Sequence, residues 1–469
     1  MEVYINVKNF GKISEARVNI SNFTVFVGNN NSGKTQLMEL IYTVMKHLSS
    51  KIPNITIPRM EQMDAFSIGR KELCEMNAWV NAYLAKHINA IIEKSFHAAI
   101  PVEEVTLEFE HPDSSYEIYC LTEKTINYVL KENGNIREFL TPELISQAVA
   151  DTGEFYGSII LKNNIQGDKT KIEEMRVPAG LPVEVARGIG ICHVLADVFG
   201  AKAPSSSNVL FMPASRMGLS LLYKRYFANN RQDTGMLTRP EKEIGAVTEP
   251  VSDFLTFLLD YSYSERTAKK NDDLIRFISS YLIDGTIREN GETTEYIPEG
   301  QENAIPVFVA SSMVNEVVPV VKALTDSKET DFIFYDEVET SMHPLKQMEM
   351  VKLLNRLNNK GVKLIVSTHS DTMATKMNNL LLLSYGDFDF EAVRKLLKKN
   401  GIDIEQEDLL ISPNIHVYQF VNQSKDKSMV EELVFQKTPC TGYDFSLFHD
   451  STMHLFEEAK IAMGIEDEN

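Results

Sequence analysis

The chain has 469 residues and a formal net charge of −19, from 47 Lys and Arg against 66 Asp and Glu. This acidic balance gives no general attraction to phosphate backbones, so a protein coated in nucleic acid is disfavoured, while a local basic groove stays open. Hydrophobic residues make up 43% of the chain and charged residues 24%, as in ordinary globular proteins. The length predicts two or three domains.

Cysteine spacing and hydropathy indicate the compartment. The four cysteines are far apart and form no C-x-x-C pair: Cys74, Cys120, Cys192 and Cys440. This spacing predicts neither a zinc site nor a disulfide framework and suits a reducing environment. No apolar run approaches the roughly 20 residues of a membrane helix, and the N-terminus enters a strand pattern with no signal peptide. We therefore expect a cytoplasmic protein without membrane contact.

A glycine-rich segment near the N-terminus carries the clearest chemical signal. Residues 28–35 match G-x-x-x-x-G-K-[ST] at every fixed position. The apolar run 23–27 before it is typical of a buried strand, and residues 36–45 after it have helical spacing. Strand, loop and helix in this order are the context in which the motif binds phosphate. The candidate nucleotide-binding residues are Gly28, Asn29, Asn30, Asn31, Ser32, Gly33, Lys34 and Thr35.

The chemistry of such a loop predicts its ligands. Glycines let the backbone approach an anion closely, and N–H groups and the helix N-terminus then face the phosphates. Lys34 would reach the β- and γ-phosphates, and the Thr35 hydroxyl would ligate Mg²⁺. We therefore expect ATP and Mg²⁺ as cofactors. The alternative is a chance Gly/Asn turn before a helix, which the later segments disfavour.

A pair of carboxylates follows a second buried-strand pattern. Residues 332–335 are Phe-Ile-Phe-Tyr, and Asp336 and Glu337 come directly after them. Asp336 would hold Mg²⁺, directly or through water, and Glu337 would orient and deprotonate the attacking water. The alternative is an ordinary acidic loop after a strand.

A histidine ends the next strand pattern, residues 363–368. The helical segment 345–357 separates the two strands, which predicts a β-α-β unit with parallel strands. His369 would then lie at the carboxyl end of its strand, where its imidazole could donate to the γ-phosphate and report its presence. A structural histidine is the alternative.

Three further polar residues are weaker candidates. Arg216 follows the strand pattern 208–212 and is expected either to contact a phosphate or a neighbouring subunit, or to be structural beside an N-capping Ser215. Ser311 and Ser312 stand at a predicted strand-to-helix boundary. They are expected to be N-caps or phosphate ligands.

Together these segments resemble the ATP-binding cassette ATPases of the SMC/RecF/OLD type. Within that superfamily they are most similar to ATPases of prokaryotic anti-phage systems, such as the ATPase subunits of PARIS and Septu. The resemblance covers residues 3–45 and, more loosely, 208–371. It is carried by the segments KNFG, GNNNSGKT, PASRMGL, ASSMVNEVVP, YDEVETSMHP and STHSD.

The resemblance implies an α/β fold with an ABC-type P-loop ATPase core. Residues 1–50 would form an N-terminal β-rich lobe with the Walker A loop, and residues 51–200 an inserted helical and β-rich region. Residues 201–380 would form a second ATPase lobe with a signature-like segment, the Walker B strand and the histidine switch. Residues 381–469 would form a C-terminal α/β extension.

The resemblance also implies a mechanism that needs two chains. Such ATPases sandwich ATP between protomers, so Ser311 and Ser312 would contact the γ-phosphate of nucleotide held by the other chain. Met313 stands where the family usually has glycine, which puts a tight contact and fast turnover in question. A slow or non-hydrolysing ATP-bound scaffold is therefore one alternative.

The implied partners are a homo-oligomer of nucleotide-sandwich dimers, a separate effector nuclease or toxin, and a phage-derived trigger. The tail after residue 380 is too short for the TOPRIM domain of OLD nucleases, so an effector would be another polypeptide. The alternative function is a RecF/SMC-like ATPase that acts on DNA in repair or maintenance, and direct DNA binding is left open.

Overall fold

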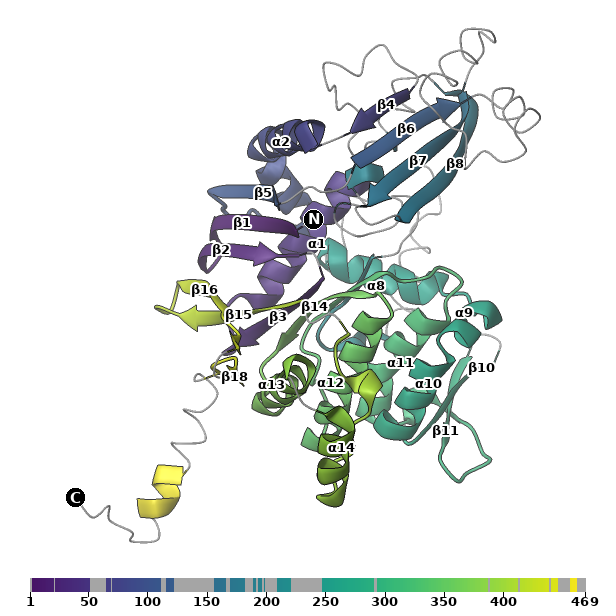
Figure 1. The fold of residues 1–469 in the computed structure, drawn as a ribbon, viewed down its shortest axis with the longest axis vertical. Coiled ribbons are helices and arrows are strands. Elements are labelled where there is room, and N and C mark those ends of the chain that lie inside the picture. Colours follow the sequence, from purple (N-terminus) through teal and green to yellow (C-terminus); the bar gives the residue numbers. More distant parts are fainter. Residues whose placement is uncertain are drawn as a thin grey trace, which may run out of the picture.

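The structure is a computed structural model, and every structural statement below concerns the residues that it describes. These are residues 2–20, 22–50, 65–68, 70–110, 115–121, 156–165, 169–181, 189–190, 193–195, 198, 209–220, 247–290, 293–386, 389–411, 414–437, 440–445 and 456–461. Element labels are those of Figure 1.

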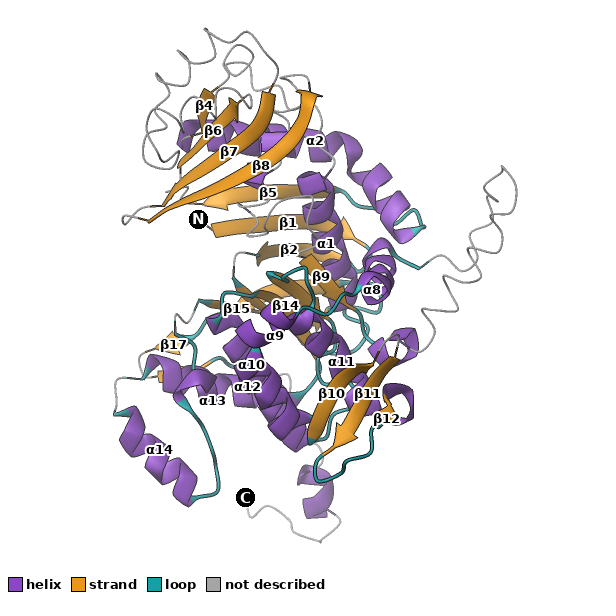
Figure 2. Cartoon of the chain, turned by 90° about the vertical axis from the view of Figure 1, so that its right-hand side faces the viewer, coloured by secondary structure: helices purple, strands orange, loops and turns teal. Residues whose placement is uncertain are grey.

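One large mixed sheet organises the described chain (Figures 1 and 2). Its order is β5-β1-β2-β16-β15-β3-β14-β13-β9. Strands β15, β3, β14, β13 and β9 run parallel, whereas β1 pairs antiparallel with β2 and with β5. The strands in this order are Glu104–Glu110, Glu2–Phe10, Ile13–Asn19, Ser428–Leu433, Ile415–Asn422, Phe23–Gly28, Lys363–Thr368, Phe332–Tyr335 and Val209–Met212.

Helices cover both faces of the parallel strands. In β13, Phe332 and Phe334 join the hydrophobic cluster that contains α1 and α2, while Ile333 and Tyr335 join the cluster of α8 and α10–α13. Because both faces are buried, the strand is a continuous apolar run and not an alternating one. The helices are α1 (Lys34–Ser50), α2 (Arg70–Phe96), α8 (Glu249–Asp260), α9 (Glu265–Lys270), α10 (Asp272–Phe277), α11 (Ser312–Thr325), α12 (Pro344–Asn359), α13 (Asp371–Tyr385) and α14 (Phe390–Lys399).

Smaller elements lie around this sheet. An antiparallel sheet of order β4-β6-β7-β8 stands at the top of Figure 1. Its strands are Ala65–Ile68, Ser115–Leu121, Tyr156–Ile165 and Lys169–Leu181. A hairpin forms from β10 (Gly285–Asn290) and β11 (Thr293–Pro298), beside the short β12 (Ile305–Pro306). The remaining short elements are the π-helix Ile278–Leu282, the 3₁₀ helices Val307–Val309 and Gln406–Asp408, and strands β17 (Gln436–Lys437) and β18 (Cys440–Gly442).

The α/β class and the parallel β-α-β unit agree with the sequence prediction, but several segments lie elsewhere than expected. Residues 415–433 of the expected C-terminal extension form β15 and β16 inside the main sheet, between β3 and β2. Residues 104–110 of the expected insertion form its edge strand β5. The expected strand before Ser311 is a 3₁₀ turn, Val307–Val309.

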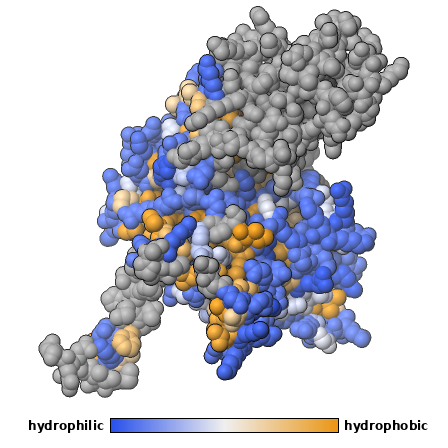
Figure 3. All heavy atoms as spheres, viewed as in Figure 1, coloured by the Kyte–Doolittle hydropathy of each residue, from blue (hydrophilic) through white to orange (hydrophobic). Residues whose placement is uncertain are grey.

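The surface of the described chain is mostly hydrophilic on the face drawn in Figure 3, with hydrophobic side chains gathered in small patches. Among the residues described, no helix combines the length and the apolar character that crossing a bilayer requires.

Candidate nucleotide-binding site

The glycine loop leaves the carboxyl end of β3 in a conformation that needs glycine. Gly28 has φ +142° and Gly33 has φ +94°, in the region that L side chains rarely adopt. A Cβ on Gly28 would also lie 2.6 Å from the Phe420 carbonyl oxygen of β15. Helix α1 begins directly after the loop, with the Leu37 N–H donating to the Gly33 carbonyl at 2.9 Å. The loop thus passes from strand to helix within six residues.

A cavity of about 430 Å³ opens over this loop, within the usual range of roughly 300–1,000 Å³ for small-molecule sites. It brings together side chains from β13, β14 and α1 that are far apart in sequence. Gly28, Asn29 and Asn30 are not part of its lining. The lining residues are Gly11, Lys12, Asn31, Ser32, Gly33, Lys34, Thr35, Gln36, Glu337 and His369.

Three of these residues, Gly11, Lys12 and Gln36, were not among the predicted site residues. Lys12 lies in the turn between β1 and β2, and its ammonium donates to the Asn31 carbonyl at 3.2 Å. Its only sequence signal is that it directly follows the KNFG segment. The spacing of residues in the sequence does not predict that this turn lies beside the glycine loop, because the contact depends on long-range pairing of the strands.

Lys34 is held across the loop by three acceptors. Its Nζ donates to the carbonyls of Gly28 at 2.9 Å and Asn29 at 2.8 Å and to the Ser32 hydroxyl at 3.2 Å. Burial lowers the pKa of the Lys34 ammonium to about 8, against the opposing effect of nearby carboxylates led by that of Asp336. Lys34 is therefore a cation at neutral pH, poised where phosphates would compete for its three donors.

Thr35 and Asp336, the two predicted magnesium ligands, meet in the structure. Asp336 is fully buried at the end of β13, and its Oδ2 accepts from the Thr35 hydroxyl at 2.8 Å. Its Oδ1 accepts from the Ser367 hydroxyl at 2.5 Å. A hydroxyl and a carboxylate side by side are the hard oxygen donors that Mg²⁺ prefers. The residues present therefore fit a magnesium ion.

Glu337 and His369 also lie together. His369 Nε2 is 3.4 Å from Glu337 Oε1, and His369 Nδ1 is 2.9 Å from the Gly28 carbonyl oxygen. Because a carbonyl can only accept, Nδ1 carries a proton in this contact. Nε2 can therefore donate to the Glu337 carboxylate only when the ring is an imidazolium. His369 thus bridges the start of the glycine loop and the candidate base.

Glu339 is a third carboxylate that the sequence reading passed over. It accepts from the backbone N–H of His369, and its charge acts on Lys34. The sequence places three carboxylates within four residues, Asp336, Glu337 and Glu339. It does not indicate which of them faces the cavity.

The expectation that Arg216 contacts phosphate is wrong. Arg216 has no exposed surface, and its guanidinium donates to the backbone carbonyls of Pro213, Asp336 and Glu337 at 2.9, 2.6 and 3.1 Å. Its Nε also pairs with Glu316 at 2.9 Å. Because Arg216 is fully buried and its guanidinium is occupied by these partners, the structural alternative is the correct one.

Ser311 and Ser312 lie outside the cavity. Ser311 is the N-cap of α11, where its hydroxyl accepts from the Val314 N–H at 3.4 Å, and Ser312 is the first helical residue. Both serines are exposed, whereas Met313 is half-buried and packs against the hydrophobic core. The helix N-terminus therefore presents two hydroxyls outward, and the methionine side chain is taken up by the core.

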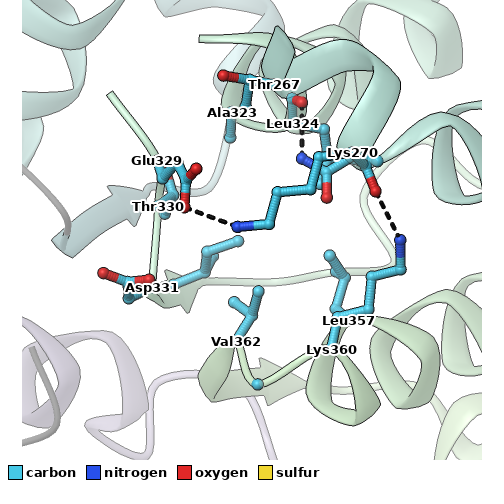
Figure 4. A pocket seen from close by; sticks show the side chains of 13 residues that line it. Thr267, Lys270, Ala323, Leu324, Glu329, Thr330, Asp331, Leu357, Lys360 and Val362 are labelled. Carbon is cyan, nitrogen blue, oxygen red and sulfur yellow. Dashed lines mark hydrogen bonds and ion pairs between the residues drawn. The ribbon is translucent and has the colours of Figure 1, made fainter. Parts of the chain in front are cut away.

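A second cavity, of about 290 Å³, lies at the amino end of β13, opposite Asp336 (Figure 4). Lys270 crosses it to Glu329 at 2.7 Å, and the Lys360 ammonium donates to the Lys270 carbonyl at 3.1 Å. Its lining contains no loop of the phosphate-binding type, and both of its lysines pair with nearby residues of the same chain. The cavity over the glycine loop is therefore the better candidate for a nucleotide.

Comparison with known proteins identifies the family of this chain. The sequence pattern of the AAA ATPase domain family matches residues 1–174 and 251–374, which is more than half of the chain. The chain belongs to the AAA ATPase domain family. The matched ranges contain the glycine loop, the paired carboxylates and His369.

Individual relatives are more distant. The chain is 35% identical over 81 residues to the energy-coupling factor transporter ATP-binding protein EcfA of Carboxydothermus hydrogenoformans, a match to 16% of this chain and 30% of that protein. The chain thus spans under a third of that relative.

Solved structures with similarity include the Smc head bound to the C-winged helix domain of ScpA, at 11% identity over 93% of this chain and 98% of that one, with a TM-score of 0.37. The SMC head domain from Thermotoga maritima is 12% identical over 92% and 100% of the two chains, with a TM-score of 0.32.

Proposed function

We propose that the protein is a Mg²⁺-dependent ATPase. The observation that carries the proposal is the 2.8 Å contact between Thr35 and Asp336, beside Lys34, Glu337 and His369. These groups come from the glycine loop, its helix and two neighbouring parallel strands. Oriented cations, a magnesium-binding pair and a carboxylate base are the parts that phosphoryl transfer to water requires.

Each residue has a separate role in this reaction. The Lys34 ammonium offsets charge on the β- and γ-phosphates. Glu337 accepts a proton from water as the water oxygen bonds to the γ-phosphorus and the bond to the ADP oxygen breaks. His369, held by the Gly28 carbonyl, keeps an imidazole beside Glu337 and the γ-phosphate position. When bound, Mg²⁺ would neutralise phosphate charge and polarise its oxygens.

We further propose that two copies close on the nucleotide. Ser311 and Ser312 present their side chains at the N-terminus of a 14-residue helix, where N–H groups favour an anion. Phe308 and Val309 before them are 64% and 63% exposed, and Leu345, after the His343-Pro344 segment, is 62% exposed. A second copy of the chain would cover these three exposed apolar side chains.

The pairing has a direct test in mixed dimers. A Lys34→Ala chain and a Ser312→Arg chain are each expected to hydrolyse little ATP alone, because every site in either homodimer carries a lesion. Mixed in equal amounts, they form heterodimers with one doubly damaged site and one intact site, so hydrolysis is expected to return in part. Steady-state ATPase rates against mixing ratio measure this. Heterodimers that demonstrably form without recovering activity would contradict a shared site whose two halves act independently.

We also propose that the ATPase controls a separate effector, a nuclease or toxin, in cytoplasmic defence against phage. The proposal rests on the narrower resemblance of the PASR and YDEVETSMHP segments and on the charge of −19, which gives little reason for the chain to coat DNA. A chain that acts on DNA itself, as RecF-like ATPases do, is the competing outcome.

One co-expression experiment separates these outcomes. The chain alone is expected to leave single-stranded and duplex DNA and RNA intact with Mg²⁺, Mn²⁺ and ATP. Co-expressed with the neighbouring genes, it is expected to change cell growth, and Lys34→Ala should remove that change. Hydrolysis that is strongly stimulated by DNA in the pure chain, with no growth effect from any neighbour, would favour the DNA-acting alternative.

A further inference from the structure

We propose that Arg216 and Glu316 are a buried positioning pair that holds the catalytic turn at Glu337 and ties it to α11. The inference rests on the proposed ATPase function and adds residues that do not touch nucleotide. It follows from the same buried contacts that keep the Arg216 guanidinium away from phosphate.

The first observation is where the guanidinium donors go. Nη1 binds the Asp336 carbonyl at 2.6 Å, and Nη2 binds the Glu337 carbonyl at 3.1 Å. One planar group therefore holds two successive carbonyls, which a lysine's single ammonium could not match in the same geometry. The guanidinium also lies 4.6 Å over the Tyr335 ring. With no exposed surface on Arg216, water cannot replace these donors.

The second observation is the backbone of Glu337 itself. Its φ is +44°, a conformation that a residue other than glycine keeps only when its surroundings hold it. The Glu337 N–H donates to the Ser367 hydroxyl at 2.8 Å, and its carbonyl accepts from Arg216 and from the Thr340 hydroxyl at 2.8 Å. This fixed turn places the carboxylate 3.4 Å from His369. Without Arg216, the turn would relax and the carboxylate would move off its position.

The third observation is the link to α11. Glu316, only 2% exposed, lies one helical turn after Ser312. Its Oε2 is 2.9 Å from Arg216 Nε, and its Oε1 accepts from the Met217 N–H at 3.1 Å. A displacement of α11, whose N-terminus carries the exposed serines, would therefore pull on the group that holds Glu337. The pair makes hydrolysis depend on the position of α11.

The test compares kcat with nucleotide affinity in variants of the full chain. Arg216→Met with Glu316→Leu removes both buried charges together, so neither is left unpaired and the fold should be retained. Glu316→Gln keeps an acceptor for Met217 and is the milder second variant. The matched control is Arg288→Met with Glu295→Leu, an ion pair of the β10–β11 hairpin remote from the cavity.

The expected result is a split between binding and turnover. The double variant should stay folded but melt several degrees below wild type, because buried backbone groups lose their partners, and it should bind ATP within about twofold. Its kcat should fall at least about tenfold, since small misplacements of a catalytic group are costly. Glu316→Gln should show a smaller loss of kcat, and the control none.

Three results would overturn the inference. The first is a folded double variant whose kcat equals that of wild type. The second is a loss of ATP affinity as large as the loss of kcat. The third applies if the double variant does not fold, and it is an unchanged kcat in Glu316→Gln. A wild-type chain that hydrolyses no ATP would overturn the proposed function, and with it any need to position a base.

Discussion

Glu337→Gln is expected to slow ATP hydrolysis at least about a hundredfold while leaving ATP affinity within about twofold. The amide has nearly the same size and shape as the carboxylate, but it cannot accept the proton from water. The backbone bonds of residue 337 to Ser367 and Arg216 do not involve its side chain, so the turn should persist. Single-turnover hydrolysis and equilibrium binding of ATP measure the two quantities separately.

Glu339→Gln is the matched control, because the same change is made two residues along the chain. Its amide oxygen still accepts from the His369 N–H, so hydrolysis is expected to fall by no more than about threefold. If Glu339→Gln abolished hydrolysis while Glu337→Gln did not, the base would be Glu339. Trapped in its ATP-bound form, Glu337→Gln should also elute as a larger species with ATP than without it if two copies close on the nucleotide.

The sequence could predict the site because its chemistry is local. Three features of the sequence indicate the same edge of a parallel sheet. They are a glycine at each end of the loop, a lysine at the start of the helix, and polar residues at the ends of apolar strands. Thr35 and Asp336 are 301 positions apart, yet the sequence predicted both as magnesium ligands, and the structure brings them into contact. Local signals therefore selected Thr35, Asp336, Glu337 and His369, which the structure brings to one edge of the sheet.

Arg216 and β15 show where such reasoning ends. An arginine after a strand end near the nucleotide has the same sequence signal whether it points to the cavity or into the core. Only the buried Glu316 on a distant helix decides between them. Likewise, residues 415–422 have no motif, and their place beside β3 follows from long-range strand pairing. Lys12 was missed for the same reason, because sheet closure brings its turn to Asn31.

Lys34→Ala is expected to weaken ATP binding by about 1.5–3 kcal/mol at pH 7, the usual value of a charge-assisted hydrogen bond. This corresponds to roughly a 10- to 150-fold rise in Kd. The variant loses the cation, which at this pH is protonated because the pKa of Lys34 is about 8. Calorimetric titration of ATP into folded wild type and variant measures the difference. Lys12→Ala, which removes a second cavity lysine, is the matched control and should cost less.

The pKa of Lys34 gives this prediction a second, independent signature. Bound phosphates favour the ammonium, so the pKa of Lys34 must be higher in the complex than the value of about 8 in the free protein. Between these two pKa values, binding ATP takes up a proton. Wild-type affinity should therefore be constant below about pH 8 and fall as pH rises above it, by at most about tenfold per pH unit. Lys34→Ala has no such group and should show a flat profile over the same range. Equal affinities for wild type and Lys34→Ala at pH 7, or parallel pH profiles, would exclude Lys34 as the phosphate-binding cation.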